Sequence, residues 1–103
     1  MADGVSRRQR QISDELRRRV AVMLKKKVRD ARLNQVTIMS VSVSPDLKNA
    51  SIYYMVPDGV DRAITSQAFC EAEGFFSYEL ARDMKVRVVP KLKFIYDEVS
   101  YIQ

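Results

Sequence analysis

Residues 7–32 constrain the fold most, because they combine a helical apolar pattern with a large excess of positive charge. At about 100° per residue, six apolar side chains fall within one arc of roughly 160°. They are Ile12, Leu16, Val20, Met23, Leu24 and Val28. Most basic side chains lie outside this arc, but Lys27 lies within it and Val22 is an exposed apolar residue. Such a helix is stable only when the rest of the chain covers its apolar face.

The charge of this segment favours a polyanionic partner. Residues 7–32 carry eleven Lys and Arg against three acidic residues, a local charge of +8, whereas the rest of the chain sums to −3. Pairs at i,i+4 such as Arg10–Asp14 neutralise only a few of these bases. The asymmetry therefore predicts a nucleic-acid partner. An anionic membrane is the alternative for a basic amphipathic helix, but this apolar face has no Trp or Phe and is needed by the rest of the fold.

The composition fits one folded domain without a metal or a cofactor. The chain has 103 residues, of which 47% are hydrophobic, enough for a single core. No apolar run approaches the roughly 18 residues of a membrane span. The single cysteine and the absence of histidine exclude an internal disulfide, structural zinc and His-dependent nucleophilic catalysis. We expect Cys70 to be a small buried residue.

The Arg-rich N-terminus has a second interpretation, as a mitochondrial presequence. Asp14 and Glu15 interrupt the basic stretch, and a helix with folded-domain patterning follows without a spacer. There is no apolar segment of the kind that secretory signals contain. We therefore expect a protein of the reducing cytoplasm.

The first half of the chain predicts a helix and a hairpin. Ser6 or Ser13 can cap the helix, which should reach about Val28. Two strands rich in β-branched residues, 35–44 and 50–56, are separated by a short turn with Pro, Asp and Asn, which predicts antiparallel pairing. The first strand changes phase between Ile38 and Met39, which indicates a bulge or burial on both faces.

The second half predicts a long helical segment and a last strand. Asp61 can cap a helix that continues to about Lys85, with Gly74 in its middle, where a bend or a close approach of another group would explain a glycine. In the final strand, 86–96, Pro90 should mark the beginning or an edge position. The order is α-β-β-α-(kink)-α-β in one domain, residues 6–98, and we expect residues 1–5 and 99–103 to be flexible ends.

This α+β order, with a three-stranded sheet packed against helices and a basic first helix, resembles the type II KH fold of RNA-binding domains. Four strings in the chain carry a closer resemblance. They are VSVSPDL at 41–47, ASIYY at 50–54, AEGF at 72–75 and RVVPKLKF at 87–94. Together they resemble the ribosome-binding factor A family, bacterial assembly factors of the small ribosomal subunit.

The resemblance implies a particular mode of RNA binding. Ordinary KH domains clamp single strands with a GXXG loop, but glycine occurs here only at positions 4, 59 and 74. The family replaces that loop with an Ala-x-Gly kink, so Ala72 and Gly74 are expected to set shape. This chain departs from the family at Ala31, where a proline is common, which leaves that loop less rigid. Three glutamates near the kink, Glu71, Glu73 and Glu79, are unfavourable for direct phosphate contact there.

By this resemblance the partner is the immature 30S small subunit and its 16S ribosomal RNA. The implied role is non-catalytic and supports late maturation, processing of the 5′ end of 16S rRNA and growth in the cold. We expect the protein to be a monomer. It should contact RNA through exposed Lys and Arg side chains of the first helix, together with three further basic residues just past the kinked helix. These residues are Arg7, Arg8, Arg18, Arg19, Lys25, Lys26, Arg29, Arg82, Lys85 and Arg87.

The sequence is also compatible with other functions. A KH-like module could bind another structured RNA, or DNA, outside the ribosome. An RNA-processing enzyme would need clustered carboxylates for metal-assisted cleavage, whereas the acidic residues are dispersed along this chain. Tyr53 and Tyr54 could stack on bases, but adjacent strand residues point to opposite faces, so we expect core or edge positions for them.

Overall fold

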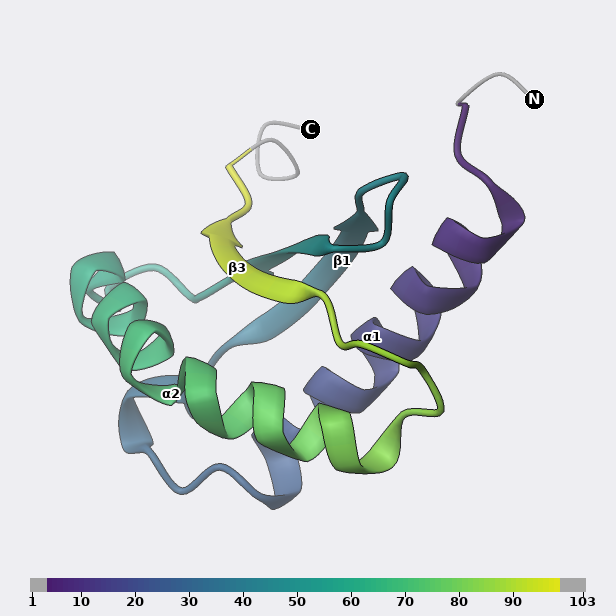
Figure 1. The fold of residues 1–103 in the computed structure, drawn as a ribbon. Helices are drawn as coiled ribbons and strands as arrows, with labels where there is room; N and C mark the ends of the chain where they lie inside the picture. Colours follow the sequence, from purple (N-terminus) through teal and green to yellow (C-terminus); the bar gives the residue numbers. More distant parts are fainter. Residues whose placement is uncertain (1–3, 99–103) are drawn as a thin grey trace.

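The computed structural model describes residues 4–98 and confirms the α+β class. Two helices pack against a three-stranded sheet (Figure 1). The elements are α1 (Arg7–Lys26), a 3-10 helix η1 (Ala31–Leu33), β1 (Thr37–Val43), β2 (Asn49–Met55), α2 (Arg62–Asp83) and β3 (Lys91–Tyr96). The expectation of flexible ends concerns mainly residues 1–3 and 99–103, which lie outside the described residues.

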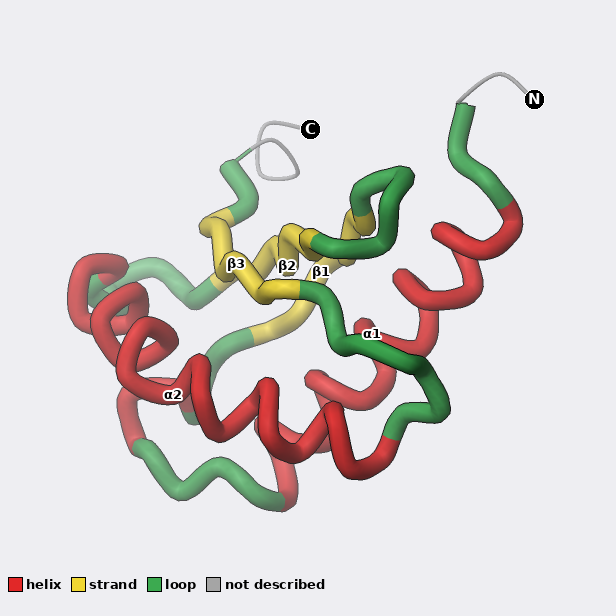
Figure 2. Tube along the Cα trace, in the orientation of Figure 1, coloured by secondary structure: helices red, strands yellow, loops and turns green. Residues whose placement is uncertain are grey.

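The sheet has the order β1-β2-β3. β1 and β2 form the expected antiparallel hairpin, and β3 pairs with β2 in parallel after the crossover through α2 (Figure 2). The register of the hairpin shifts between Ile38 and Ser40, so the predicted bulge is confirmed. Alternate residues of β2, among them Ile52 and Tyr54, are buried in one core with residues of both helices. Both helices therefore cover the same face of the sheet.

Ser6, not Ser13, caps helix α1, because Ser6 takes part in a capping box. Gln9 N donates to Ser6 Oγ at 3.0 Å, and Ser6 N donates to Gln9 Oε1 at 2.9 Å, which satisfies two otherwise free donors. The amide Nε2 of Gln9 also donates to the carbonyl oxygen of Val43 at 2.8 Å. One glutamine thus caps the helix and ties its first turn to the end of β1.

Helix α2 begins at the predicted cap, where Ala63 N donates to the side chain of Asp61 at 2.9 Å. The two predicted helical halves are one continuous helix, which changes direction near its middle (Figures 1 and 2). The alternative of a close approach at Gly74 is wrong, because a Cβ placed there would meet nothing within 4 Å. The bend, and not crowding, distinguishes this part of the helix.

Three further expectations are settled by burial and strand boundaries. The last strand is shorter than predicted and starts directly after Pro90, which confirms that the proline marks its beginning. Cys70 is exposed, so the prediction of a buried cysteine is wrong: its neighbour Phe69 occupies the core-facing position of α2. Tyr54 is buried, with its ring centroid 4.7 Å from that of Phe69, as the core interpretation predicts.

Candidate nucleic-acid interface

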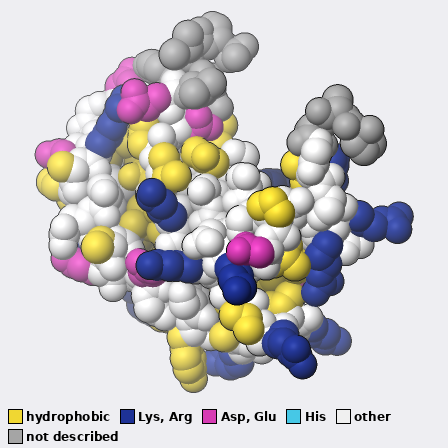
Figure 3. Space-filling view, turned by 45° about the horizontal axis from the view of Figure 1, so that its top comes forward, with side chains coloured by type: hydrophobic (Ala, Val, Ile, Leu, Met, Phe, Trp, Pro, Cys, Tyr) yellow, Lys and Arg dark blue, Asp and Glu magenta, His cyan; other side chains and the backbone are white. Residues whose placement is uncertain are grey.

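Helix α1 separates its apolar and cationic faces as its sequence predicts. Ile12, Leu16, Val20 and Met23 are buried in the core, so the opposite side of the helix faces solvent. Lys and Arg side chains gather along the α1 side of the molecule, while Asp and Glu lie mostly on the other side in this view (Figure 3). Because the apolar face of α1 is buried in the core, the charged side chains of the opposite face are held in solvent.

Most of the predicted RNA-binding residues are exposed and have no ion-pair partner among residues 4–98. Those on or directly after α1 are Arg7, Arg8, Arg18, Lys25, Lys26 and Arg29. The helix has 20 residues and so a length of about 30 Å. These cations are therefore spread over a distance that spans several phosphates of a nucleic-acid strand.

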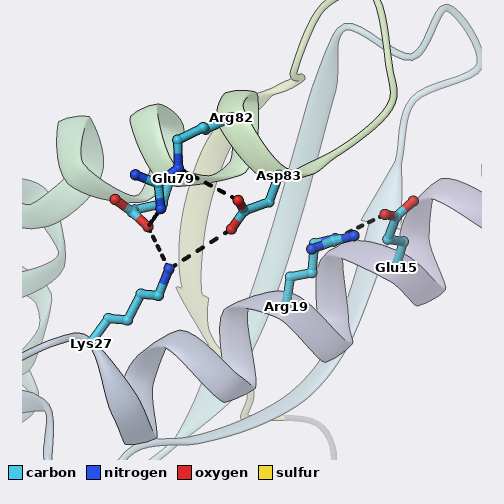
Figure 4. Close-up of polar contacts among 6 residues, drawn as sticks. All are labelled: Glu15, Arg19, Lys27, Glu79, Arg82 and Asp83. Atoms are coloured by element: carbon cyan, nitrogen blue, oxygen red, sulfur yellow. Dashed lines mark hydrogen bonds and ion pairs between the residues drawn. The ribbon is translucent and has the colours of Figure 1, made fainter.

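Arg19 differs from these neighbours because its charge is already paired. Its Nε donates to Glu15 Oε2 at 2.8 Å, one turn earlier on the helix (Figure 4). An exposed pair of this kind is weak, but it reduces the charge that Arg19 presents to a ligand. Arg19 is the least available of the predicted residues on α1.

A second ion-pair cluster joins the end of α1 to α2. Glu79 is buried, and its Oε1 accepts from Lys27 Nζ at 2.8 Å and from Arg82 at 3.0 Å (Figure 4). Asp83 lies 3.9 Å from Lys27 and 3.6 Å from Arg82. Arg82, which the sequence places in the RNA-binding set, is therefore already paired with these carboxylates, although its side chain is 54% exposed.

The segment after α2 brings two more predicted residues to α1. Lys85 lines a groove of about 400 Å³ together with Arg8 and Arg18 of α1. Asp14 and Glu15 also line it, and Glu15 is paired with Arg19. Arg87 lines an adjoining groove that also includes Arg8. Residues separated by more than sixty positions in sequence thus form one cationic surface, whereas Lys25, Lys26 and Arg29 extend it toward the far end of α1.

Lys48 and Lys91 also border the groove beside Arg8 and Arg87, and the sequence reasoning missed both. They meet because β2 and β3 pair in parallel, with Asn49 opposite Lys91 and Lys91 N donating to Lys48 O at 2.8 Å. Neither lies in a basic run, so the only signal was the pairing of two strands far apart in sequence.

The acidic residues near the bend are largely neutralised. Arg32 bonds to Asp30 at 2.6 Å and to Glu71 at 2.7 Å, and this guanidinium holds the pKa of both carboxyl groups below their usual values. Glu79 is paired with Lys27 and Arg82. Of the three glutamates near the bend, Glu73 is therefore the one without an ion pair among the described residues. Asp30 also accepts from Arg32 N at 3.0 Å, so hydrogen bonds fix the loop in which the family commonly has a proline.

Ala72 is half-buried against the core and Gly74 is exposed, both in the middle of α2. In the part of the chain that the structure describes, there is no group of three or more acidic or cysteine side chains that could hold a metal ion. None of the helices described is both long and apolar enough to cross a membrane. The arrangement offers a cationic surface for a polyanion.

Comparisons with known proteins bear on the family and the fold. The family model of ribosome-binding factor A matches residues 8–101. The chain is 38% identical over 94 residues to ribosome-binding factor A of Coxiella burnetii, with 91% of this chain and 79% of that protein covered. The crystal structure of ribosome-binding factor A from Thermus thermophilus superimposes with a TM-score of 0.77 at 25% identity, covering 85% of this chain and 94% of that one.

A second similar structure is a homology model of the Thermus thermophilus factor fitted into a cryo-electron microscopy map of its complex with the 30S subunit. It has a TM-score of 0.71 and 26% identity, and covers 84% of this chain and 92% of that one.

Proposed function

This chain belongs to the ribosome-binding factor A family, and on that premise we propose that it binds the small ribosomal subunit as an assembly factor. The contact is with 16S ribosomal RNA through the cationic face of α1. One observation carries this proposal: the basic residues of that face are exposed, and most have no ion-pair partners among residues 4–98. The similar Thermus thermophilus protein, which was fitted into a 30S complex, supports the choice of partner.

The interface acts through the phosphate backbone. Lys and Arg side chains along a helix position a protein on phosphates and do not read base sequence. The chain also lacks the paired glycines with which KH domains clamp a single strand. The protein therefore recognises the shape of folded RNA.

The role within assembly follows from the family resemblance alone. It comprises late maturation of the 30S subunit, support for processing of the 5′ end of 16S rRNA, and growth in the cold. The protein works in the cytoplasm as a monomer and performs no chemistry itself. The dispersed carboxylates of residues 4–98 support the last point, because metal-assisted cleavage of RNA needs several of them together.

Charge reversal tests the interface directly. The variant with Arg18→Glu, Lys25→Glu and Lys26→Glu should fold normally, because all three side chains are exposed, and should no longer sediment with immature 30S subunits. For a matched single change, Lys25→Glu is compared with Lys93→Glu, which alters the same charge on the exposed side of β3. Equal losses for both single variants, or no loss for the triple variant, would remove α1 from the interface.

Competition assays separate the ribosomal function from the alternatives. Immature subunits should displace the labelled protein from duplex DNA and from anionic vesicles. Displacement in the opposite direction would indicate a nucleic-acid or membrane partner outside the ribosome. Incubation of precursor rRNA with the pure protein and magnesium should give no cleavage above background, and cleavage would show that the protein is an enzyme.

A further inference from the structure

The larger groove beside the cationic surface has a chemistry of its own. It has a volume of about 580 Å³ and lies between the first turns of α1, the β1–β2 turn, the second half of α2 and residues 86–91. The cationic surface of α1 borders it only through Arg8. Its lining therefore comes from four segments that only the fold brings together.

The floor of this groove is apolar. Ile12 and Pro90 are buried, and Leu47, Val86 and Val89 are half-buried against the core. This surface is built in part around an uncommon backbone conformation, because Leu47 has a φ of 63°, a region that bulky residues rarely adopt. The turn holds it there through Leu47 N, which donates to Ser44 O at 2.8 Å.

The lip of the groove continues this apolar surface into solvent. Val88 is 68% exposed, although it follows the half-buried Val86 and precedes the half-buried Val89 in an irregular segment. A single exposed valine needs no explanation. An exposed valine beside an apolar groove enlarges a contiguous surface of the kind that marks interaction sites.

The rim of the groove is cationic. Arg8, Lys48, Arg87 and Lys91 are exposed, and none has an ion-pair partner within residues 4–98. Of the two acidic residues in the lining, Asp46 is committed to its own turn, where its Oδ1 accepts from Ser44 Oγ at 2.6 Å and from Lys48 N at 3.0 Å. Even when the second acidic residue, Glu73, is counted, the lining has an excess of positive charge. An occupant that carries negative charge at its edges thus fits this rim.

The apolar floor of the groove favours a protein segment over RNA as its ligand. No aromatic ring lines the groove, so it offers no platform on which a base could stack. The phosphates of an RNA could contact the cationic rim, but they would leave the apolar floor exposed to water. An apolar side chain flanked by carboxylates satisfies both parts, because its burial removes the floor from water while the carboxylates meet the rim.

We propose that this groove docks an acidic segment of a partner protein, which inserts an apolar side chain over Val86 and Val89 and places carboxylates against Lys48 and Lys91. This contact is separate from RNA binding by α1. It gives the protein a second face through which another protein can be held beside the RNA.

A synthetic amphipathic peptide, with leucine and phenylalanine on one side and glutamate and aspartate on the other, serves as the probe. Added to the ¹⁵N-labelled protein, it should shift the amide signals of residues 46–48 and 86–91. Val88→Glu, which introduces a carboxylate at the exposed lip, should weaken peptide binding by about tenfold or more. The matched control is Val22→Glu, the same change at an exposed valine of α1 outside the groove, and it should leave peptide binding unchanged.

Three outcomes would overturn the proposal. The first is equal peptide affinity for the Val88→Glu and Val22→Glu proteins. The second is equal binding of a peptide whose acidic residues are replaced by lysine. The third is loss of 30S co-sedimentation by Val88→Glu, which would assign the groove to the RNA interface; we expect this variant to sediment with subunits normally. Because the peptide assay contains no RNA, its result stands independently of whether α1 binds the subunit.

Discussion

Lys27 Nζ at the end of α1 lies 2.8 Å from the buried carboxylate oxygen Oε1 of Glu79 in α2, across 52 positions of sequence. The sequence places Lys27 within the apolar arc of its helix, where an ammonium group must reach outward. In the structure it reaches the other helix instead. The same contact explains how a glutamate is accommodated on the core-facing side of α2, because its charge is paired twice, by Lys27 and by Arg82.

We expect Lys27→Met to lower the free energy of unfolding by about 1 kcal/mol. Methionine keeps most of the stem but leaves Glu79 with Arg82 alone, and the effect is modest because Lys27 is itself partly exposed. Urea unfolding of this variant and of Lys26→Met provides the measurement. Lys26 is exposed with no ion pair among the described residues, so an equally large loss for that control would contradict a specific role for the Lys27–Glu79 pair.

Gln9→Ala should lower the free energy of unfolding by about 1–3 kcal/mol, because it leaves the carbonyl oxygen of Val43 without its buried donor. It also removes one half of the capping box with Ser6. Gln11→Ala, at an exposed position of the same helix, is the matched control. If the two alanine variants unfold at the same denaturant concentration, the link between α1 and β1 contributes nothing measurable.

Gly74→Ala should raise the free energy of unfolding by about 1 kcal/mol. The position is helical, has open space for a Cβ and lacks a positive φ, so the ordinary helix preference of alanine over glycine applies. If the glycine sets the bend of α2 for subunit binding, the same variant should bind 30S subunits less well while being more stable. A less stable Gly74→Ala protein would show that the bend itself requires glycine.

Binding to 30S subunits should weaken steeply with salt. If about five phosphates are contacted, the logarithm of the affinity falls by about 3.5 to 4.5 per logarithm of salt concentration, or about 100- to 500-fold from roughly 50 to 200 mM. Each reversal among the exposed residues should lower that slope by about one. Arg19→Glu should change it less than Arg18→Glu, because Arg19 is already paired with Glu15. A slope near zero for the unmodified protein would refute phosphate contact.

Stability should fall at acid pH through the carboxyl groups around Arg32. Because the guanidinium lowers the pKa of Asp30 and of Glu71 below 3.8 and 4.5 respectively, the unfolded chain takes up protons first as the pH falls. The free energy of unfolding therefore decreases from about pH 5 downward and levels off below the lowered pKa values.

Arg32→Gln removes the largest cause of both pKa shifts but leaves the hydrogen bonds from the backbone N–H of residue 32 and from Gln67, so its stability should change less over this pH range. Arg29→Gln, at a neighbouring exposed position without an ion pair in the described part of the chain, should follow the unmodified protein. Thermal unfolding from about pH 3 to pH 7 gives the comparison. Parallel curves for all three proteins would mean that the Arg32 contacts do not contribute to the acid transition.

Local patterns determined much of this fold. Apolar spacing and cap residues gave both helices to within about two residues of the predicted bounds, because these signals lie in adjacent turns of one helix. The phase change at Met39 predicted the bulge, and Pro90 the start of β3, for equally local reasons. The segregation of charge onto one face of α1 likewise followed from the 3.6-residue period of that helix alone.

Tertiary structure decided which of those charges are available. The i,i+3 pair of Arg82 with Glu79 is local to α2, but nothing local shows that Lys27 meets Glu79 and Asp83, because that pairing depends on how α1 packs against α2. The meeting of Lys85 and Arg87 with Arg8, and of Lys48 with Lys91, also required the crossover and the parallel pairing of β3. Sequence periodicity fixes the face of an element on which a side chain lies, but long-range packing fixes what that side chain meets, and this surface depends on both.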